Sequence, residues 1–188
     1  MSRRVVPLLV ALLLAGCSGP SEEDVPGPES LNNTDVMFLQ MILPHHRQGL
    51  ELAGLGHTKG ARAELVQLAA AIEATQTDEV ALMAGILADS GAPSSAPSTG
   101  GADPHAAHGG LPGTSAQQVA ALEAATGDEF ERRFLSTMMG HQGDAIQLAK
   151  MEVAGGADER LVDLARRIER SRTAQIDQMR KLLDATPR

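Results

Sequence analysis

The segment FLQMILPHHRQGLELA, residues 38–53, recurs 96 positions later as FLSTMMGHQGDAIQLA, residues 134–149. A gapless alignment of residues 35–87 with residues 131–183 contains 16 identities in 53 positions, and most other apolar positions match apolar ones. Self-similarity at a fixed offset is typical of a repeated structural unit. The sequence therefore predicts an internal duplication, with chance similarity between two helical hairpins of biased composition as the alternative.

Each copy is predicted to form a hairpin of two helices. Apolar residues recur at i, i+3, i+4 and i+7 on both sides of a glycine-containing loop. Two such hairpins joined by a long crossover predict an all-α four-helix bundle with ferritin-like connectivity. The bundle is expected over residues 32–188, with repeat one at 32–89, a linker at 90–115, and a short helix with repeat two at 116–184.

Capping residues and glycines predict where the helices begin and end. Asn33 or Thr34 is expected to cap the first helix, with Asp35 in its first turn, where a carboxylate interacts favourably with the helix dipole. Ser115 and Gln118 have the spacing of a capping box at the start of the short helix, 116–125. The other predicted boundaries are the exit of the first helix at Gly54, Gly56 and Gly60, the second helix at about 62–88, the third from about 128, and the fourth at about 158–183.

The composition fits a helical domain that is held together by packing. The chain has 188 residues, among them no Trp, no Tyr and 3 Phe. This argues against a β-sandwich, because strands favour aromatic and β-branched residues. The only cysteine, Cys17, precedes the predicted bundle, so neither a disulfide nor a thiolate ligand is expected inside it.

The N-terminus, residues 1–17, resembles a bacterial lipoprotein signal. Arg3 and Arg4 precede an apolar run that is short for a membrane span, and LAGC ends at Cys17. The resemblance implies cleavage before Cys17, lipidation of that cysteine, export, and attachment to the outer face of the cell membrane. Residues 18–31, rich in Pro, Gly, Ser and Glu, are expected to act as a tether. Removing both arginines from the 16 basic residues leaves 14 against 24 acidic ones, a formal charge of −10, which argues against nucleic acid as a partner.

Both repeats are predicted to point a histidine into the core. At about 100° per residue, His45 lies in the middle of the apolar face of the first helix, and His141 holds the equivalent place in the second repeat. His46 falls near the edge of that face. Pro44 and Gly140 precede the two histidines, and both weaken a helix. Their recurrence at one repeat position indicates a requirement of shape, either a local kink or a close backbone approach.

The candidate metal site combines these histidines with neighbouring methionines. Imidazole and thioether ligands suit Cu(I) or Cu(II), and imidazole alone also accepts zinc, so copper is the expected metal and zinc the less favoured one. Glu79, on the inward face of the second helix, either joins the site or forms a buried ion pair with Arg172. Inward methionines and histidines are also common as packing and hydrogen-bonded core residues. The candidate metal ligands are His45, His46, His141, Met41, Met138 and Glu79.

Both repeats resemble the ferritin-like, four-helix family named domain of unknown function 305, over about residues 32–183. In the first copy the resemblance rests on Asp35, Phe38, Met41, Pro44, His45, His46, Ala53, Gln76, Glu79 and Met83. In the second copy it rests on LPG at 111–113, ALEAATGDEFERRFL at 121–135, and Met138, Met139, His141, Ala145, Ala149 and Met179. The resemblance implies an exported protein, and some members of the family are implicated in copper binding through His and Met.

The second copy departs from the family pattern. His141 is followed by Gln142 where the family repeats His-His, and Arg172 and Gln175 stand where the family has Gln and Glu. We therefore expect at most one good site, dominated by the first repeat. Methionines typical of the family are replaced by Thr114, Leu52 and Leu148.

Two hypotheses about function follow. The first is an envelope-anchored protein that binds copper for sequestration or delivery. The second is a metal-free helical interaction or structural module of the envelope, in which the inward polar residues form a hydrogen-bonded network. An enzyme is not expected: no Glu has a His three residues later, as a ferritin-like di-iron centre requires, and no GxSxG, P-loop, Rossmann or HExxH motif is present.

Overall fold

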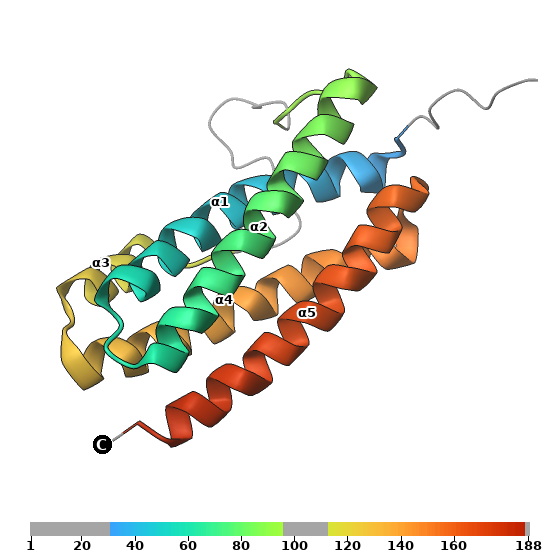
Figure 1. Ribbon diagram of the computed structural model, residues 1–188. Helices are drawn as coiled ribbons and strands as arrows, with labels where there is room; N and C mark the ends of the chain where they lie inside the picture. The colour runs from blue at the N-terminus through green and yellow to red at the C-terminus, as the bar shows by residue number, and fades with distance from the viewer. Residues whose placement is uncertain (1–30, 96–112, 187–188) are drawn as a thin grey trace, which may run out of the picture.

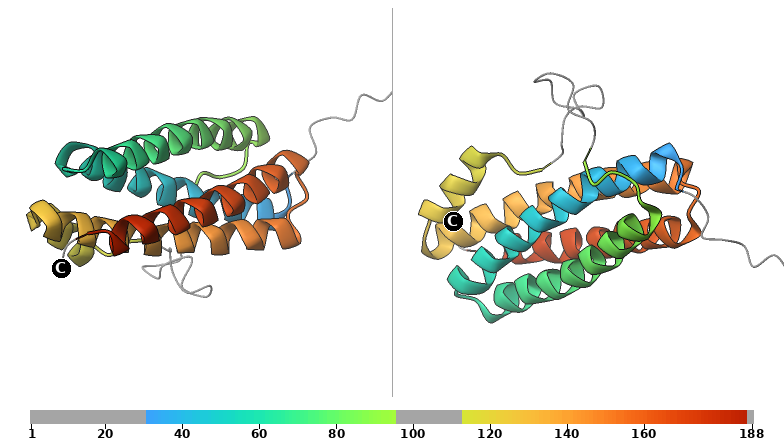
Figure 2. Two further views of the ribbon diagram at one scale, coloured as in Figure 1. Left: turned by 60° about the horizontal axis from the view of Figure 1, so that its bottom comes forward. Right: turned by 90° about the horizontal axis from the view of Figure 1, so that it is seen from above.

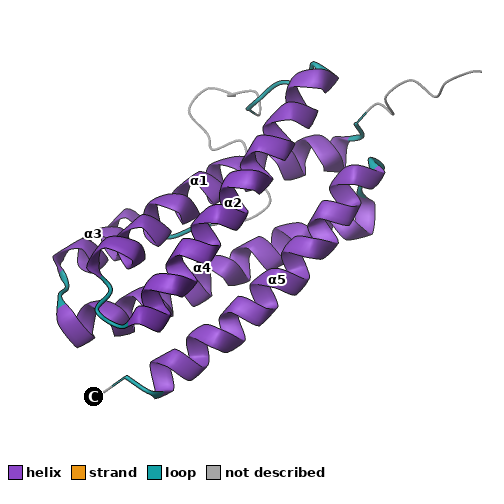
Figure 3. Ribbon diagram, viewed as in Figure 1, coloured by secondary structure: helices purple, strands orange, loops and turns teal. Residues whose placement is uncertain are grey.

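The computed structural model describes residues 31–95 and 113–186 (Figure 1). These residues form five helices and no strand, which confirms the all-α class (Figure 3). The predicted signal peptide, Cys17, nearly all of the tether and residues 96–112 of the linker lie outside the described residues. The helices are α1 (Asn33–Lys59), α2 (Ala63–Ser90), α3 (Ala116–Ala124), α4 (Gly127–Gly155) and α5 (Glu159–Asp184).

The four long helices form two hairpins, α1 with α2 and α4 with α5 (Figure 1). The hairpins meet mainly through α1 and α4, whereas α2 and α5 touch at few places. The short helix α3 packs at the end of the molecule where α4 begins (Figure 2). Because α1 and α4 carry the contact between the hairpins, their inward residues occupy the centre of the molecule.

The interior contains two apolar clusters. Cluster A lies at the end where α1 begins and includes Phe38, Ile42 and Ile168. Cluster B lies at the opposite end, near α3, and includes Phe130 and Phe134. The first half of α1 contributes to cluster A together with the second half of α4, so these two helices run antiparallel. Full burial of side chains of this size stabilises a fold by about 1.5–3 kcal/mol each, so the clusters supply most of the packing energy.

The N-cap of the first helix lies one or two residues before the predicted position. Asn32 is the N-cap: its side chain accepts a hydrogen bond from the Asp35 amide at 2.9 Å, and the Asp35 carboxylate accepts one from the Asn32 amide at 2.6 Å. The prediction of Asn33 or Thr34 was therefore wrong by one or two residues, because the reciprocal partner of the cap is Asp35. The predicted capping box of Ser115 and Gln118 is present at the start of α3.

The exit of the first helix agrees with the prediction at Gly60 but not at Gly54 and Gly56. The helix continues through Gly54 and Gly56 and ends at Lys59, with Gly60 as its C-cap. Gly56 is needed for packing, because a Cβ at this position would collide with the ring of Phe134 from α4. Pro44 lies inside α1 on its exposed side and does not end the helix.

Each hairpin loop is held by an acidic residue of the other hairpin. Asp35 accepts hydrogen bonds from the amides of residues 157 and 158, at 2.9 and 3.2 Å. Glu131 accepts hydrogen bonds from the amides of residues 61 and 62, at 3.0 and 2.8 Å. Position 131 is 96 residues after position 35, and the loops 61–62 and 157–158 are separated by the same offset. The two ends of the molecule are thus closed by equivalent contacts.

The two ends differ in charge. Glu131 is paired with the guanidinium of Arg62, whereas Asp35 lies beside a second buried acid, Glu152. Both carboxylate oxygens of Glu152 lack a hydrogen-bond donor, and position 152 corresponds to Gly56 in the first repeat. Burial, followed by the nearby carboxylates of Asp35 and Asp158, raises the pKa of Glu152 to about 8. Glu152 is therefore protonated in the folded protein at neutral pH.

We predict that Glu152 makes the folded protein less stable as the pH rises towards 8. The ordinary pKa of Glu is 4.5, so between this value and about 8 only the folded state holds the proton. The free energy of unfolding then falls as pH rises, by roughly 1–2 kcal/mol between about pH 6.5 and 8. Glu152→Gln, which mimics the protonated acid, should remove this slope in urea unfolding curves measured across that range.

The matched control is Glu51→Gln, which removes an exposed carboxylate from the same bundle and should leave the slope unchanged. An equal slope in wild type and Glu152→Gln would show that Glu152 ionises normally in the folded state.

Candidate metal site

Three imidazole rings lie together between clusters A and B. His45 from α1 and His141 from α4 are stacked, with ring centroids 3.8 Å apart and ring planes 14° apart. The ring of His46 lies 6.1 Å from that of His45, measured between centroids. All three side chains are buried, His46 completely. The helical period thus brings His45 and His141 to the same point, and His46 lies inside the core rather than at its edge.

The buried rings are neutral at neutral pH. Burial lowers the pKa of His45 to about 2 and that of His141 to about 4. Repulsion between imidazoles if both were protonated, followed by repulsion from Arg172, lowers both pKa values further. Burial likewise lowers the pKa of His46, opposed by its hydrogen bond to Glu79. A neutral imidazole carries one lone pair that can bind a metal ion.

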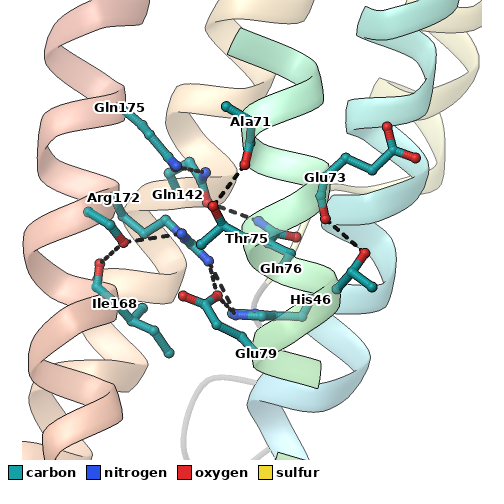
Figure 4. A network of polar contacts seen from close by, with 12 residues as sticks. His46, Ala71, Glu73, Thr75, Gln76, Glu79, Gln142, Ile168, Arg172 and Gln175 are labelled. Carbon is teal, nitrogen blue, oxygen red and sulfur yellow. Dashed lines mark hydrogen bonds and ion pairs between the residues drawn. The ribbon is translucent and has the colours of Figure 1, made fainter. Parts of the chain in front are cut away.

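A charged network lies beside the histidines (Figure 4). Arg172 reaches from α5 to an ion pair with Glu79 on α2, and its side chain is fully buried. Glu79 also contacts His46, at 2.8 Å between its Oε2 and the ring Nε2. Because the carboxylate is an acceptor, His46 donates through Nε2, which leaves the lone pair on Nδ1. The predicted alternative, a Glu79–Arg172 ion pair, is present, so Glu79 is not a free carboxylate.

The equivalent positions of the second repeat carry a neutral pair. Gln142 donates to Gln175 at 2.6 Å, and these residues lie 96 positions after His46 and Glu79. Gln76 lies 3.5 Å from Gln142 through its side-chain nitrogen, and it corresponds to Arg172 (Figure 4). We call these residues, together with His45 and His141, the polar layer. His46, Glu79 and Arg172 form its charged half, and Gln76, Gln142 and Gln175 form its amide half.

Several buried polar atoms of the layer have no hydrogen-bond partner. They include both ring nitrogens of His45, Nε2 of His141, Nδ1 of His46 and Oε1 of Gln76. Two of them converge on Gly49: a Cβ there would lie 2.9 Å from His141 Nε2 and would collide with Gln76 Oε1. A buried polar atom without a partner costs about 1–3 kcal/mol. The backbone at Gly49 thus lies close to two unpartnered polar atoms and leaves no room for a side chain.

The chain that follows the linker covers His141. Thr114 exchanges two hydrogen bonds with the Gln48 side chain, at 2.7 and 2.8 Å. Its hydroxyl lies 3.4 Å from His141 Nδ1. Gly113, just before it, has a φ of 157° and no room for a Cβ beside Gln48. Residues 113–114 therefore close the polar layer from one side.

The two methionines are separated from each other. Met41 packs in cluster A and Met138 in cluster B, so they lie on opposite sides of the histidine layer. Within residues 31–95 and 113–186, no group of three or more His, Cys, Asp or Glu side chains is arranged to hold a metal ion. The three histidines are brought together, but their present ring orientations do not form a cage.

Sequence reasoning did not assign several residues of this layer. Gly49 is a glycine inside a predicted helix, on the same face as His45, and that position was the available signal for a close approach. Gln142 and Gln175 could be found from the repeat alignment, since they replace His46 and Glu79. Nothing in the local sequence indicates Thr114, because its contact depends on how the linker returns to the bundle.

The fold and the buried centre define an all-helical domain with an interior layer of imidazoles. The chain belongs to the family described as Domain of unknown function (DUF305), which matches residues 35–183. This confirms the resemblance seen in the sequence. The search of curated proteins finds no match.

Solved structures share the fold. A DUF305 fragment from Deinococcus radiodurans is similar with a TM-score of 0.71 and 26% identity, covering 83% of this chain and 99% of that one. A DUF305 protein from Streptomyces coelicolor, named as secreted, has a TM-score of 0.73 and 22% identity, covering 81% and 93%. CopM in its Cu(I)-bound form has a TM-score of 0.65 and 24% identity, covering 82% and 98%. CopM is also known in Cu(II)-bound and Ag-bound forms.

The described helices give no sign of a membrane span. None of them, within the two described ranges, is both long and apolar enough to cross a bilayer.

We predict that Glu79→Gln strongly destabilises the fold. It leaves the Arg172 charge buried without a counter-charge, which costs about 3–5 kcal/mol. The double variant Glu79→Gln/Arg172→Gln carries amides only, as the second repeat does at 142 and 175, and should be closer to wild type. Urea unfolding of Glu79→Gln, Arg172→Gln and the double variant gives the coupling energy between the two side chains.

The control pair is Glu129 and Arg133, an exposed ion pair on α4 with 2.8 Å between its charged atoms. Its coupling energy should stay below about 1 kcal/mol. Coupling of Glu79 and Arg172 as small as that of the control pair would contradict the buried ion pair.

Proposed function

We propose that this protein is an exported, lipid-anchored metal binder of the cell envelope, with copper as its ion and sequestration or delivery as its role. The observation that carries the proposal is the stacked pair of neutral, buried imidazoles, His45 and His141, in which both ring nitrogens of His45 and Nε2 of His141 lack partners. We propose no catalytic activity.

The unpartnered atoms support a ligand in this layer. Buried polar groups in folded proteins are almost always hydrogen-bonded, so a group of such atoms calls for an explanation. They include an amide oxygen and imidazole nitrogens, and each neutral ring has one lone pair that attracts a cation. The other unpartnered atoms, one N–H of His45 and the Nε–H of Arg172, are donors and do not bind a cation. The chemistry of the donor set therefore fits a metal ion.

The arrangement of His46 supports it as a ligand. A metal-binding histidine usually donates its other ring N–H to a carboxylate or carbonyl, which fixes the tautomer and orients the ring. His46 has this arrangement through Glu79, and its Nδ1 is buried and unpartnered. His45 and His141 would have to turn out of their stack to bind one ion together with it. Met41 and Met138 remain proposed ligands, from opposite sides of the layer.

Copper is favoured by the donor types. Imidazole and thioether without thiolate suit copper in either oxidation state, and zinc fits the imidazoles only. CopM, which shares this fold, binds Cu(I), Cu(II) and Ag. Glu79 is the weakest of the proposed ligands, because Arg172 and His46 already occupy it.

We also propose that the domain is a ferritin-like four-helix bundle that arose by duplication of one hairpin. The support is the set of contacts related by an offset of 96 residues: the loop contacts of Asp35 and Glu131, and the pairs His46–Glu79 and Gln142–Gln175. Two hairpins of independent origin would have no reason to form these contacts at equivalent positions.

Export and anchoring are supported by the sequence. The N-terminal signal and Cys17 indicate a lipoprotein, and a secreted protein from Streptomyces coelicolor has the same fold. The lipid on Cys17 would attach the domain to the membrane through residues 18–31.

A second function is favoured by one observation. The Arg172–Glu79 pair links α5 to α2, where the helices otherwise touch little, so the polar layer also joins the two hairpins. In this alternative the protein is a metal-free interaction or structural module, and the histidines are part of the packing.

A thermal melt with and without metal separates the two functions. A ligand of the native state raises the melting temperature by mass action. We expect Cu(I) to raise it by several degrees in the full chain carrying Cys17→Ser, which removes the only thiol, and His45→Ala and His141→Ala to abolish the increase. Metal uptake is measured in parallel by equilibrium dialysis.

The matched control is His57→Ala, which removes an exposed histidine of α1 outside the polar layer and should keep the full increase. An unchanged melting temperature with Cu(I), Cu(II) and Zn(II) would favour the metal-free module.

A further inference from the structure

The polar layer has no spare negative charge. Its unpartnered atoms belong to neutral imidazoles, to the Gln76 amide and to Nε of Arg172, and the pair opposite, Gln142 and Gln175, is neutral as well. The one carboxylate that contacts this layer in the described residues is Glu79, and the guanidinium of Arg172 already compensates it. Any metal ion that enters therefore adds its whole charge to a buried region.

The cost of that charge rises steeply with its size. The penalty for moving an ion from water into a low-dielectric interior grows with the square of the charge, so a divalent ion pays about four times as much as a monovalent one of the same size. Repulsion from a fixed positive charge grows in proportion, and is about twice as large for the divalent ion. Arg172 carries such a charge, with its Nη2 3.4 Å from His46 Nε2, and the paired Glu79 carboxylate offsets part of the repulsion.

The donor types decide which monovalent ion can enter. Sodium and potassium are hard ions that prefer several oxygen ligands, and the layer offers a single unpartnered amide oxygen. Imidazole nitrogens and thioethers prefer soft ions. The monovalent ions that fit are therefore Cu(I) and Ag(I).

We infer that Arg172 is a specificity-determining residue that makes the buried imidazole site select soft monovalent cations over divalent ones. It does so in two ways, by repelling additional charge and by holding the Glu79 carboxylate in an ion pair. The inference rests on the proposed metal-binding function and goes beyond it, because His45, His46 and His141 alone would also accept Cu(II) and Zn(II). The first repeat has Gln76 at the equivalent position, so the charge is a feature of one repeat only.

The experiment compares Ag(I), a stable monovalent probe, with Zn(II). Affinities are measured by isothermal titration calorimetry on the full chain carrying Cys17→Ser, and on Arg172→Gln and Arg172→Lys in the same background. Gln reproduces the residue of the first repeat and frees the Glu79 charge, whereas Lys keeps a positive charge. We expect the background chain to bind Ag(I) at least 100-fold more tightly than Zn(II). Arg172→Gln should bind Zn(II) more tightly and so lower the ratio of Ag(I) to Zn(II) affinity at least tenfold. Arg172→Lys should keep most of the selectivity for Ag(I).

A second variant keeps the test decisive if Arg172→Gln does not fold, which circular dichroism would show. Glu79→Gln/Arg172→Gln removes the Arg172 repulsion but leaves no free carboxylate. It should therefore narrow the ratio of Ag(I) to Zn(II) affinity measurably, but by less than Arg172→Gln does. A nitrogen-15 NMR spectrum of the histidine rings provides an independent readout: Ag(I) should shift the ring nitrogens of His45 and His141 in the background chain.

The outcomes separate the two proposals. If neither Ag(I) nor Zn(II) binds the background chain, the proposed function fails together with this inference. If both bind and the ratio is near one, or is unchanged in Arg172→Gln and in the double variant, metal binding stands and the role of Arg172 is refuted.

Discussion

The buried ion pair between Arg172 and Glu79 determines what the centre of this bundle can do. It joins α5 to α2, which have little other contact, and Glu79 in turn orients His46 on α1. A buried pair of this kind contributes little net stability compared with an apolar replacement, but the loss of one partner is costly. The pair therefore fixes the arrangement of three helices. It also engages Glu79, the one carboxylate that contacts the imidazoles within residues 31–95 and 113–186, so that this carboxylate is not free to bind a cation.

The contacts related by 96 residues show where the two hairpins are alike and where they differ. The loop contacts of Asp35 and Glu131 are equivalent, and so is the stacking of His45 on His141. The differences are changes of charge: Arg172 where the first hairpin has Gln76, and Glu152 where it has Gly56. Arg172 changes the charge at the centre of the bundle, and Glu152 changes it at one end. The two hairpins therefore have similar backbones but different electrostatics.

The sequence predicted the features that depend on helical period and not those that depend on how helices pack. The all-α class and the inward direction of His45 and His141 follow from apolar spacing. The spacing placed His46 at an edge, but α2 covers that edge, and the residue is fully buried against Glu79. Met41 and Met138 each precede an inward histidine, yet the antiparallel packing of α1 and α4 places them in different clusters.

The ends of α1 were predicted less well than those of the other helices, which lie within two residues of the prediction, because the partners of the α1 ends are distant in sequence. Asp35 caps α1 through Asn32 and also holds the loop at 157–158, so the position of the first turn is set by the other hairpin. Glycine signals were ambiguous for a similar reason: Gly56 lies within α1 because the ring of Phe134 needs the space, and not because the helix ends there. Both contacts join the two hairpins, so neither could be inferred from the sequence of one repeat alone.

The polar layer lies between two apolar clusters, and this arrangement separates stability from binding. Clusters A and B bury the large side chains, so the fold can tolerate a layer of imidazoles with unpartnered nitrogens between them. Those nitrogens have no protein partner, and they lie in a region that residues 113–114 close from one side. The free energy lost by leaving them unpartnered is regained when a ligand binds them, which makes the affinity of the site depend on how dry and closed this layer remains. On that side, a route for an ion to His141 involves opening the contact between Gln48 and Thr114, which is held by two hydrogen bonds.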